Sequence, residues 1–422
     1  MPWVGSFGAF CMGIRPKLGN HPEFLGYYFQ SERYRRTVSK LAAGSNINNL
    51  KREHISTLGI SLPPFSEQGR IVEKLDELLS DLDAGIAALE RARANLKRYR
   101  ASILKAAVEG RLTAAWRAAH PDAEHADKLL ERILAERRKR WEDAQLARYA
   151  ERGQTPPNGW MDRWPDPFIP DTSATPQLPD TWRWVGLDQI LVQPLSNGRS
   201  VPTATDGFPV LRLTALKRGS VDLDERKIGA WKRDEAEPFF VQAGDFLIAR
   251  GNGSLRLVGR GGLARHVDTE VAFPDTMIRA RPAFEARLSD YLAMVWNSSL
   301  VREQIEKVAR TSAGIYKVAQ SDLENICIPI PSSAEIAEIV ARVDEQLSAL
   351  DRNADAIDIE LTRASRLRQS ILKHAFEGKL VPQDPNDEPA STLLDRLRAA
   401  RAAAMTSPKV SARKSSSREK RA

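Results

Sequence analysis

Two long segments of the chain carry apolar residues at heptad spacing, one between residues 65 and 112 and the other between residues 332 and 380. An apolar residue at every 3.5 positions makes a stripe that is buried against another helix. The pattern predicts two long helices with Ser66 and Ser333 as N-caps and with Gly110 and Gly378 at their C-terminal ends. The predicted seam is formed by Leu75, Leu82, Leu89, Leu96 and Ile103 in the first helix, and by Val343, Leu350, Ile357, Ala364 and Ile371 in the second.

The two predicted helices are each other's simplest partners. Packing them antiparallel within one chain would bury both apolar stripes at once. Two alternatives stay open at this point: each helix packs on its own globular part, or the helices dimerise between chains.

Short apolar runs of a different kind fill residues 181–331. These runs are rich in Val, Ile and Leu and are bounded by Gly, Pro and Asp, which is typical of strands. A helix is expected at Leu288–Arg310, so this segment is predicted to be an α+β domain of mixed strands and helices.

The remaining segments are predicted to connect or to end the structure. Residues 113–153 carry opposite charges four apart and are expected to form a helical extension, whereas the proline-rich residues 154–180 are expected to be a linker. A short C-terminal helix is expected at 381–400, and the Ser/Lys/Arg-rich residues 401–422 are expected to be a disordered tail.

The chain contains an internal duplication. Pro63 corresponds to Pro331 at an offset of 268 residues, and without any gap this offset also places Glu67 on Glu335. The register holds upstream, where residues 24–47 lie over 292–315, and downstream, where residues 98–112 lie over 366–380. So long a period indicates a duplicated domain, because solenoid repeats are much shorter.

Composition narrows the class of protein only slightly. The formal net charge is +8, but the segment from Arg401 to Ala422 alone holds seven Lys or Arg and one acid, so charge is a weak indication of nucleic-acid binding. Two cysteines, Cys11 and Cys327, make a disulfide framework unexpected, which fits a reducing cytoplasm. No run of apolar residues is long enough to span a membrane.

Motifs for catalysis are missing from the sequence. There is no P-loop motif and no Asn/Asp-Pro-Pro-aromatic tetrad of the kind an amino-methylating enzyme needs to hold a base. The fragment Gly251-Asn252-Gly253 is better explained as a tight hairpin than as a cofactor cradle, and the six histidines are scattered. We therefore predict no catalytic residue, no metal site and no cofactor.

Candidate DNA-contacting residues lie in the strand-rich segment. Arginines and glycine-bearing loops suit close approach to phosphates and base edges, although arginines that alternate on a strand can simply face water. A second polar loop follows at Thr311–Val318. The candidates are Arg212, Arg250, Asn252, Arg256, Arg260, Arg265, Tyr316 and Lys317.

Taken together, these segments resemble the specificity subunit of type I restriction-modification enzymes. The resemblance rests on "LPDTWRWVGLDQI" at the start of the strand-rich domain and on "SAGIYKVAQSDLENICIPIP" at its end. It rests further on "AEIAEIVARVDEQLSALD" and "RQSILKHAFEGKLVPQDPNDEPASTLLDRL" in the second long helix and beyond, and on the matching first copy.

The resemblance implies two target-recognition domains, each of which reads one half of a split double-stranded DNA sequence, and two antiparallel spacer helices between them. It implies methyltransferase subunits that dock on the recognition domains and helices, together with a restriction/translocase subunit. The specificity subunit of this family does no chemistry itself, which agrees with the missing motifs.

The chain departs from the family pattern in its first copy. Residues 181–331 would form a complete recognition domain, but residues 1–64 match only the C-terminal part of one, without the counterpart of residues 178–271. We expect such a chain to read one half-site or to recruit a second specificity chain. The competing hypothesis is a coiled-coil scaffold without a DNA role.

Overall fold

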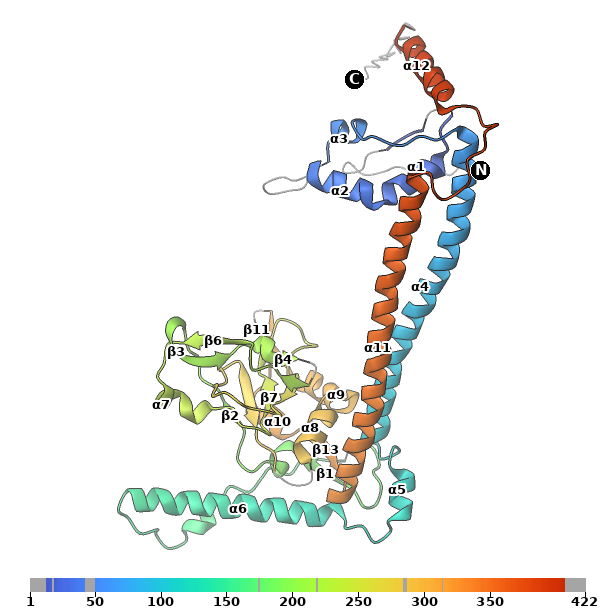
Figure 1. Ribbon diagram of the computed structural model, residues 1–422. Coiled ribbons are helices and arrows are strands. Elements are labelled where there is room, and N and C mark those ends of the chain that lie inside the picture. Colours follow the sequence, from blue (N-terminus) through green and yellow to red (C-terminus); the bar gives the residue numbers. More distant parts are fainter. Residues whose placement is uncertain are drawn as a thin grey trace, which may run out of the picture. The chain divides into compact units, whose positions relative to one another are not determined.

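The computed structural model describes residues 13–16, 19–41, 50–173, 175–217, 219–283, 287–312 and 314–406 (Figure 1). Cys11 and residues 407–422 of the expected tail lie outside the described residues. The chain forms two compact units, one made of residues 1–94 with 354–422 and the other of residues 95–353. We call them the terminal unit and the central unit. Helices α4 (Phe65–Val108) and α11 (Ser333–Phe376) contribute to both.

The terminal unit is built from helices around a small aromatic core. Pro22 begins the first helix, and the hydroxyl of Ser31 donates to the carbonyl of Tyr28 where that helix ends. Phe24 packs on Phe376 with the ring centroids 5.1 Å apart. Besides parts of α4 and α11, the helices are α1 (Pro22–Gln30), α2 (Glu32–Leu41), α3 (Arg52–Ser56) and α12 (Ala390–Thr406).

The central unit holds the described strands and the remaining helices. Its α-helices are α5 (Ala114–Ala119), α6 (Ala126–Glu151), α7 (Arg233–Ala236), α8 (Leu288–Trp296), α9 (Ser299–Val308) and α10 (Gln320–Glu324). Its short 3-10 helices are η1 (Trp160–Arg163), η2 (Leu187–Ile190), η3 (Leu213–Ala215) and η4 (Glu237–Phe239). Its strands are β1 (Arg183–Gly186), β2 (Ser196–Asn197), β3 (Thr203–Leu211), β4 (Leu216–Lys217), β5 (Ser220–Val221), β6 (Arg226–Gly229), β7 (Phe246–Ala249), β8 (Gly251–Asn252), β9 (Gly261–Leu263), β10 (Met277–Ala280), β11 (Arg310–Ser312), β12 (Ile315–Lys317) and β13 (Cys327–Ile330).

A six-stranded sheet in the order β2-β10-β7-β9-β5-β4 is the centre of residues 181–331, which we call the strand-rich lobe. All four residues of β7 are buried, which fits a continuous apolar run in a central strand. The ring of Phe246 meets that of Trp296 from α8 in an edge-on contact, 5.7 Å between centroids. Smaller sheets pair β3 with β6, β1 with β13, and β12 with both β11 and β8.

In each unit the long helices run antiparallel. Ion pairs join Arg93 to Asp358 and Asp83 to Arg368 in the terminal unit. A residue later in α4 therefore pairs with a residue earlier in α11, as antiparallel packing requires. Arg100 pairs with Asp351 in the central unit in the same sense. The expected fold class, α+β with two long antiparallel helices, is confirmed.

The predicted seam residues are buried to different depths. The flanking residues Tyr99 and Leu367 are 65% and 50% exposed. Leu75, Ile103 and Val343 are buried, whereas Leu82, Leu89, Leu96, Leu350, Ile357, Ala364 and Ile371 are partly buried.

Four expectations from the sequence need correction. Ser66 and Ser333 are not N-caps, because α4 begins at Phe65 and α11 at Ser333, and the hydroxyl of Ser332 accepts from the amide of Glu335. The helix expected at Leu288–Arg310 is two helices, α8 and α9, because Ser298 adopts an extended conformation and its hydroxyl donates to the carbonyl of Val295. The expected linker packs on other parts of the unit: the rings of Trp160 and Trp164 contact Trp141 of α6. Helix α12 continues to Thr406, into the segment for which a disordered tail was expected.

The carboxylate of Glu335 joins the strand-rich lobe to the long helices in the central unit. It is 1% exposed, and it accepts hydrogen bonds from the Thr113 hydroxyl at 2.7 Å and from Nε1 of Trp182 at 2.9 Å. The guanidinium of Arg117 on α5 also pairs with it. One side chain of α11 therefore fixes both ends of the first turn of α5, at Thr113 and Arg117, and the residue that precedes β1.

We expect Glu335→Ala to lower the free energy of unfolding of the central unit by about 2–4 kcal/mol, because it leaves a buried indole N–H and hydroxyl without their acceptor. Urea unfolding followed by tryptophan fluorescence measures this. Glu345→Ala, an exposed change on the same helix, is the control and should alter stability by no more than about 0.5 kcal/mol. Equal effects of the two changes would contradict the role of Glu335.

Candidate nucleic-acid interface

A three-stranded sheet in the central unit brings two distant polar loops together. Strand β12 pairs with β11 on one side and with β8 on the other, so that Tyr316 lies opposite Asn252 and Lys317 opposite Gly251. The amide of Val318 also donates to the carbonyl of Arg250, which extends the ladder. The structure therefore places the predicted residues Arg250, Asn252, Tyr316 and Lys317 side by side.

The side chains of this sheet lie on both of its faces. Because residues on a strand alternate between faces, the pair Tyr316 and Asn252 lies on one face and Lys317 on the other. Arg250 and Lys317 are exposed, and neither side chain has an ion-pair partner within the described parts of the chain. Oδ1 of Asn252 accepts from the amide of Ser254 at 3.0 Å, which orients its amide group. Cationic and amide donors of this kind suit phosphates and base edges.

The turn at residues 253–260 follows β8 and carries Arg256 and Arg260, both exposed. The sequence analysis missed the residue that holds this turn, Arg302 of α9. Its guanidinium donates to the carbonyl of Val258 at 2.6 Å and to that of Leu255 at 3.3 Å. Burial lowers the pKa of the Arg302 guanidinium, and Glu306 partly offsets this effect. No motif signals such a contact, because it depends on packing between distant segments.

Two predicted residues lie elsewhere. Arg212 follows β3, and its Nε donates to the carbonyl of Arg226 in the separate two-stranded β3–β6 sheet. Arg265 pairs with Asp290 at 3.1 Å and lines a cleft of about 160 Å³ that also includes Arg100 of α4 and Asp344 of α11. Arg265 thus belongs to the contact between the lobe and the long helices.

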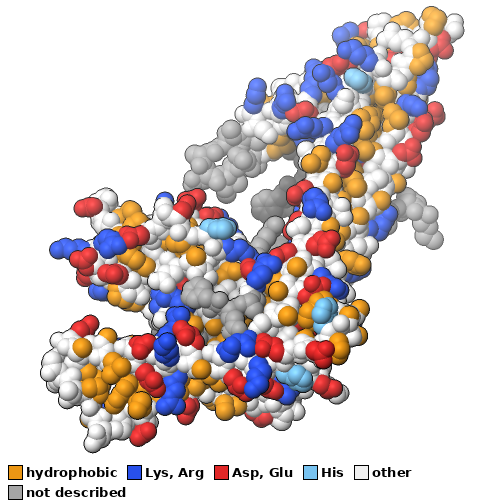
Figure 2. All heavy atoms as spheres, turned by 60° about the horizontal axis from the view of Figure 1, so that its bottom comes forward, with side chains coloured by type: hydrophobic (Ala, Val, Ile, Leu, Met, Phe, Trp, Pro, Cys, Tyr) orange, Lys and Arg blue, Asp and Glu red, His pale blue; other side chains and the backbone are white. Residues whose placement is uncertain are grey.

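Helix α6 is anchored to the lobe by a buried ion pair and carries apolar side chains toward its end. Arg137 donates to Oδ1 of Asp188 at 3.0 Å and to the carbonyl of the same residue. Hydrophobic side chains gather over the end of α6, at the lower left of Figure 2. In this part of the chain Leu146 of α6 and Met161 of η1 are 44% and 48% exposed. Acidic and basic side chains are interspersed over much of the same face.

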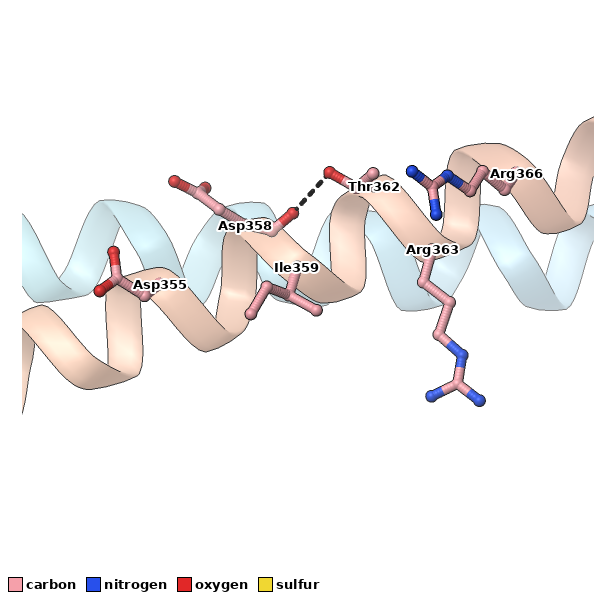
Figure 3. Close-up of a pocket in the computed structure, with 6 residues that line it drawn as sticks. All are labelled: Asp355, Asp358, Ile359, Thr362, Arg363 and Arg366. Carbon is pink, nitrogen blue, oxygen red and sulfur yellow. Dashed lines mark hydrogen bonds between the residues drawn. The ribbon is translucent and has the colours of Figure 1, made fainter.

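A hollow of about 700 Å³ lies on α11 in the terminal unit (Figure 3). The hydroxyl of Thr362 donates to the carbonyl of Asp358 in the same helix, and Ile359 is exposed beside it. This arrangement pairs no nucleophile with a base and is a helix surface rather than an active site. Its lining residues are Asp355, Asp358, Ile359, Thr362, Arg363 and Arg366.

The residues that the structure describes contain no cluster of His, Cys, Asp or Glu that could hold a metal ion. Over the same residues, no helix has the length and apolar character needed to cross a membrane.

Comparisons with known proteins agree with the fold and the residue pattern. The family "Type I restriction modification DNA specificity domain" matches residues 5–91. The chain is 30% identical to the type I restriction enzyme EcoKI specificity subunit of Escherichia coli K12 over 96% of its own length and 77% of the relative's. It is also 30% identical to the StySPI specificity subunit of Salmonella potsdam, over 95% of this chain and 76% of that one.

Among solved structures, the chain resembles one described as showing complex assembly and conformational transition of the type I R-M system. The TM-score is 0.57 with 18% identity, over 86% of this chain and 72% of that one, which supports the fold.

The chain therefore belongs to the family of type I restriction enzyme specificity subunits. The resemblance stated from the sequence is confirmed, and so is the assignment to a noncatalytic class of subunit.

We expect Arg302→Ala to loosen the turn at residues 253–260. The variant loses two hydrogen bonds from a charged donor, which should lower the local opening free energy by about 1–3 kcal/mol and speed amide exchange roughly 10- to 100-fold. Hydrogen exchange followed by mass spectrometry measures this, with β7 as an internal reference. Lys307→Ala, an exposed change on the same helix, should leave the amides of the turn as protected as in the wild type. If the turn exchanged at the wild-type rate in the Arg302→Ala variant too, Arg302 would not hold the turn.

Proposed function

We propose that this chain is the DNA-reading subunit of a type I restriction-modification complex and that the strand-rich lobe of its central unit contacts the DNA target. The family to which the chain belongs supports a role in DNA specificity. The observation that carries the assignment to the lobe is the β11-β12-β8 sheet, which gathers exposed cations and an oriented amide from two loops more than sixty residues apart in sequence.

We assign different roles to the proposed contacts. Lys317 and Arg250 would hold the DNA backbone, because an exposed cation with no ion-pair partner among the described residues can neutralise a phosphate without first losing one. Asn252 and the turn with Arg256 and Arg260 are better placed for base edges, because Asn can bind adenine and Arg can bind guanine in a bidentate manner. Tyr316, half-buried and opposite Asn252 on the paired strand, would support that side chain.

Catalysis is assigned to other subunits. We propose that methyltransferase subunits and a restriction/translocase subunit dock on this chain, and that the exposed apolar residues of the long helices and of α6 contribute to these interfaces. The reading of a split target by two half-site readers, the participation of a second specificity chain and a cytoplasmic location stay predictions.

Selection from a randomised duplex library tests the proposed function. The chain, reconstituted with its methyltransferase subunits, should enrich one defined sequence pattern over successive rounds. The competing coiled-coil scaffold hypothesis predicts recovery without any sequence preference, and that result would overturn the assignment.

We expect Arg250→Ala and Lys317→Ala each to weaken binding to all duplexes and to reduce the slope of log affinity against log salt concentration by about 1, as for the loss of one phosphate contact. Fluorescence anisotropy at several salt concentrations measures the slope. Arg138→Ala is the matched control, because Arg138 is an exposed arginine of α6 that pairs with Glu142. Slopes that match wild type in both test variants would exclude this sheet from the DNA contact.

A further inference from the structure

Three segments of the strand-rich lobe meet at one end of the six-stranded sheet, where β10 begins. Met277, the first residue of β10, pairs with Ala249, the last residue of β7. On the other side of β10, the amide of Gly198 donates to the carbonyl of Met277 at 3.3 Å, directly after β2 ends. Because β2 and β7 both run antiparallel to β10, the chain leaves them at the same end of the sheet at which it enters β10.

The chain enters β10 through a tight turn whose tip consists of Asp275 and Thr276. The amide of Met277 donates to the carbonyl of Pro274 at 3.0 Å, which closes the turn. Thr276 is exposed and Asp275 is half-buried. Within the described part of the chain, neither side chain makes a hydrogen bond or an ion pair. The tip therefore presents a carboxylate and a hydroxyl that make no such contact within this part of the fold.

An exposed arginine lies on each side of this tip. The amide of Arg250 donates to the carbonyl of Thr276 at 2.9 Å. On the other side, Arg199 directly follows Gly198, and it reaches Glu235 only at 3.9 Å. Strands β2 and β7 are the two neighbours of β10, and paired strands lie about 4.8 Å apart, so the two arginine backbones are about 10 Å apart.

The position of Arg199 depends on the glycine that precedes it. A Cβ atom at Gly198 would lie 2.2 Å from the carbonyl oxygen of Pro274 and 2.4 Å from that of Phe273. Only a residue without a side chain allows the chain to pass so close to the backbone that leads into the tip. Close backbone packing therefore holds the loop that carries Arg199 beside the tip.

The tip is continuous with the candidate interface on the β11-β12-β8 sheet. The amide of Arg250 donates to Thr276 of the tip, and its carbonyl accepts from the amide of Val318, which directly follows β12. Arg250 thus joins the tip to the three-stranded sheet. The sequence analysis missed Asp275 and Arg199, because only the pairing of β10 with β2 and β7 brings them next to Arg250.

A carboxylate in such a place is selective among base edges. An ionised carboxylate can only accept hydrogen bonds, and phosphates repel it. In the major groove, guanine presents two acceptors and thymine presents one, whereas the donors are the amino groups of cytosine and adenine. Adenine carries the acceptor N7 beside its amino group, so cytosine is the base that suits a carboxylate best.

We propose that Asp275 reads a cytosine in the major groove by accepting a hydrogen bond from its N4 amino group, while Arg199 and Arg250 bind phosphates on either side. The major groove is about 12 Å wide, so two long side chains whose backbones are about 10 Å apart can reach both of its walls with the tip between them. Asp275 acts mainly by exclusion, because guanine or thymine at this position would place acceptor against acceptor. This assignment rests on the proposed function and adds one base and the residue that reads it.

Selection from the randomised duplex library tests the assignment on the chain reconstituted with its methyltransferase subunits. The wild-type pattern should contain a cytosine that the Asp275→Ala variant no longer requires, while the other positions of the pattern stay the same. Affinity for the wild-type target should fall roughly 5- to 100-fold in this variant, as for the loss of one base contact. Affinity for duplexes of random sequence should not fall, because the variant removes a charge that phosphates repel.

A second variant gives the assignment a sharper test. Asp275→Asn should shift the same single position from cytosine to adenine, because a side-chain amide can bind N6 and N7 of adenine together. This variant keeps the size of the side chain, so it decides the question alone if Asp275→Ala does not fold. Arg199→Ala should keep the cytosine but reduce the slope of log affinity against log salt concentration by about 1.

The matched control is Asp224→Ala, which removes an equal charge from a side chain that is 94% exposed elsewhere in the lobe. It should change neither the pattern nor the affinity. If both Asp275 variants enriched the wild-type pattern, or if Asp275→Asn lost every position of the pattern at once, the assignment would be overturned and the proposed function would stand. A wild-type complex that enriched no pattern would overturn the proposed function, and this assignment with it.

Discussion

The burial of one carboxylate at the start of α11 is the constraint on which the central unit depends. Glu335 can be buried only because three donors from different segments converge on it, namely Thr113, Arg117 and Trp182. A buried charge demands such partners, so the positions of α5 and of the first residues of the lobe follow from it. The strand-rich lobe is thereby attached to the long helices through a polar contact with defined geometry, in addition to a general apolar one.

The surface that faces DNA in our proposal depends on that attachment in turn. Strand β13 leads into α11, and the short segment before it contains α10 and β12. Strand β12 then supplies Tyr316 and Lys317 to the sheet that also holds Asn252. The candidate interface is thus only a short stretch of chain away from the helix that carries Glu335, which limits how far the sheet can move relative to that helix.

Local periodicity made part of this structure predictable. The heptad pattern predicted both long helices and the duplication revealed their equivalence, because spacing along one segment determines which face of a helix is apolar. The pairing of β12 with β8 could not be predicted in this way, because it joins residues far apart in sequence through backbone groups that all residues share. The role of Arg302 was missed for the same reason. Arg265 was chosen for its charge alone, and only the structure shows that Asp290 already neutralises it.

The duplication also shows how identical local sequence can have different physical consequences. Glu335 and Glu67 occupy the same position of the repeat, and both are buried beside the glycine that ends the partner helix. The first is satisfied by an indole, whereas the second has no such donor among the residues described. Sequence comparison of the two copies reports the conserved acceptor but not the state of its partner.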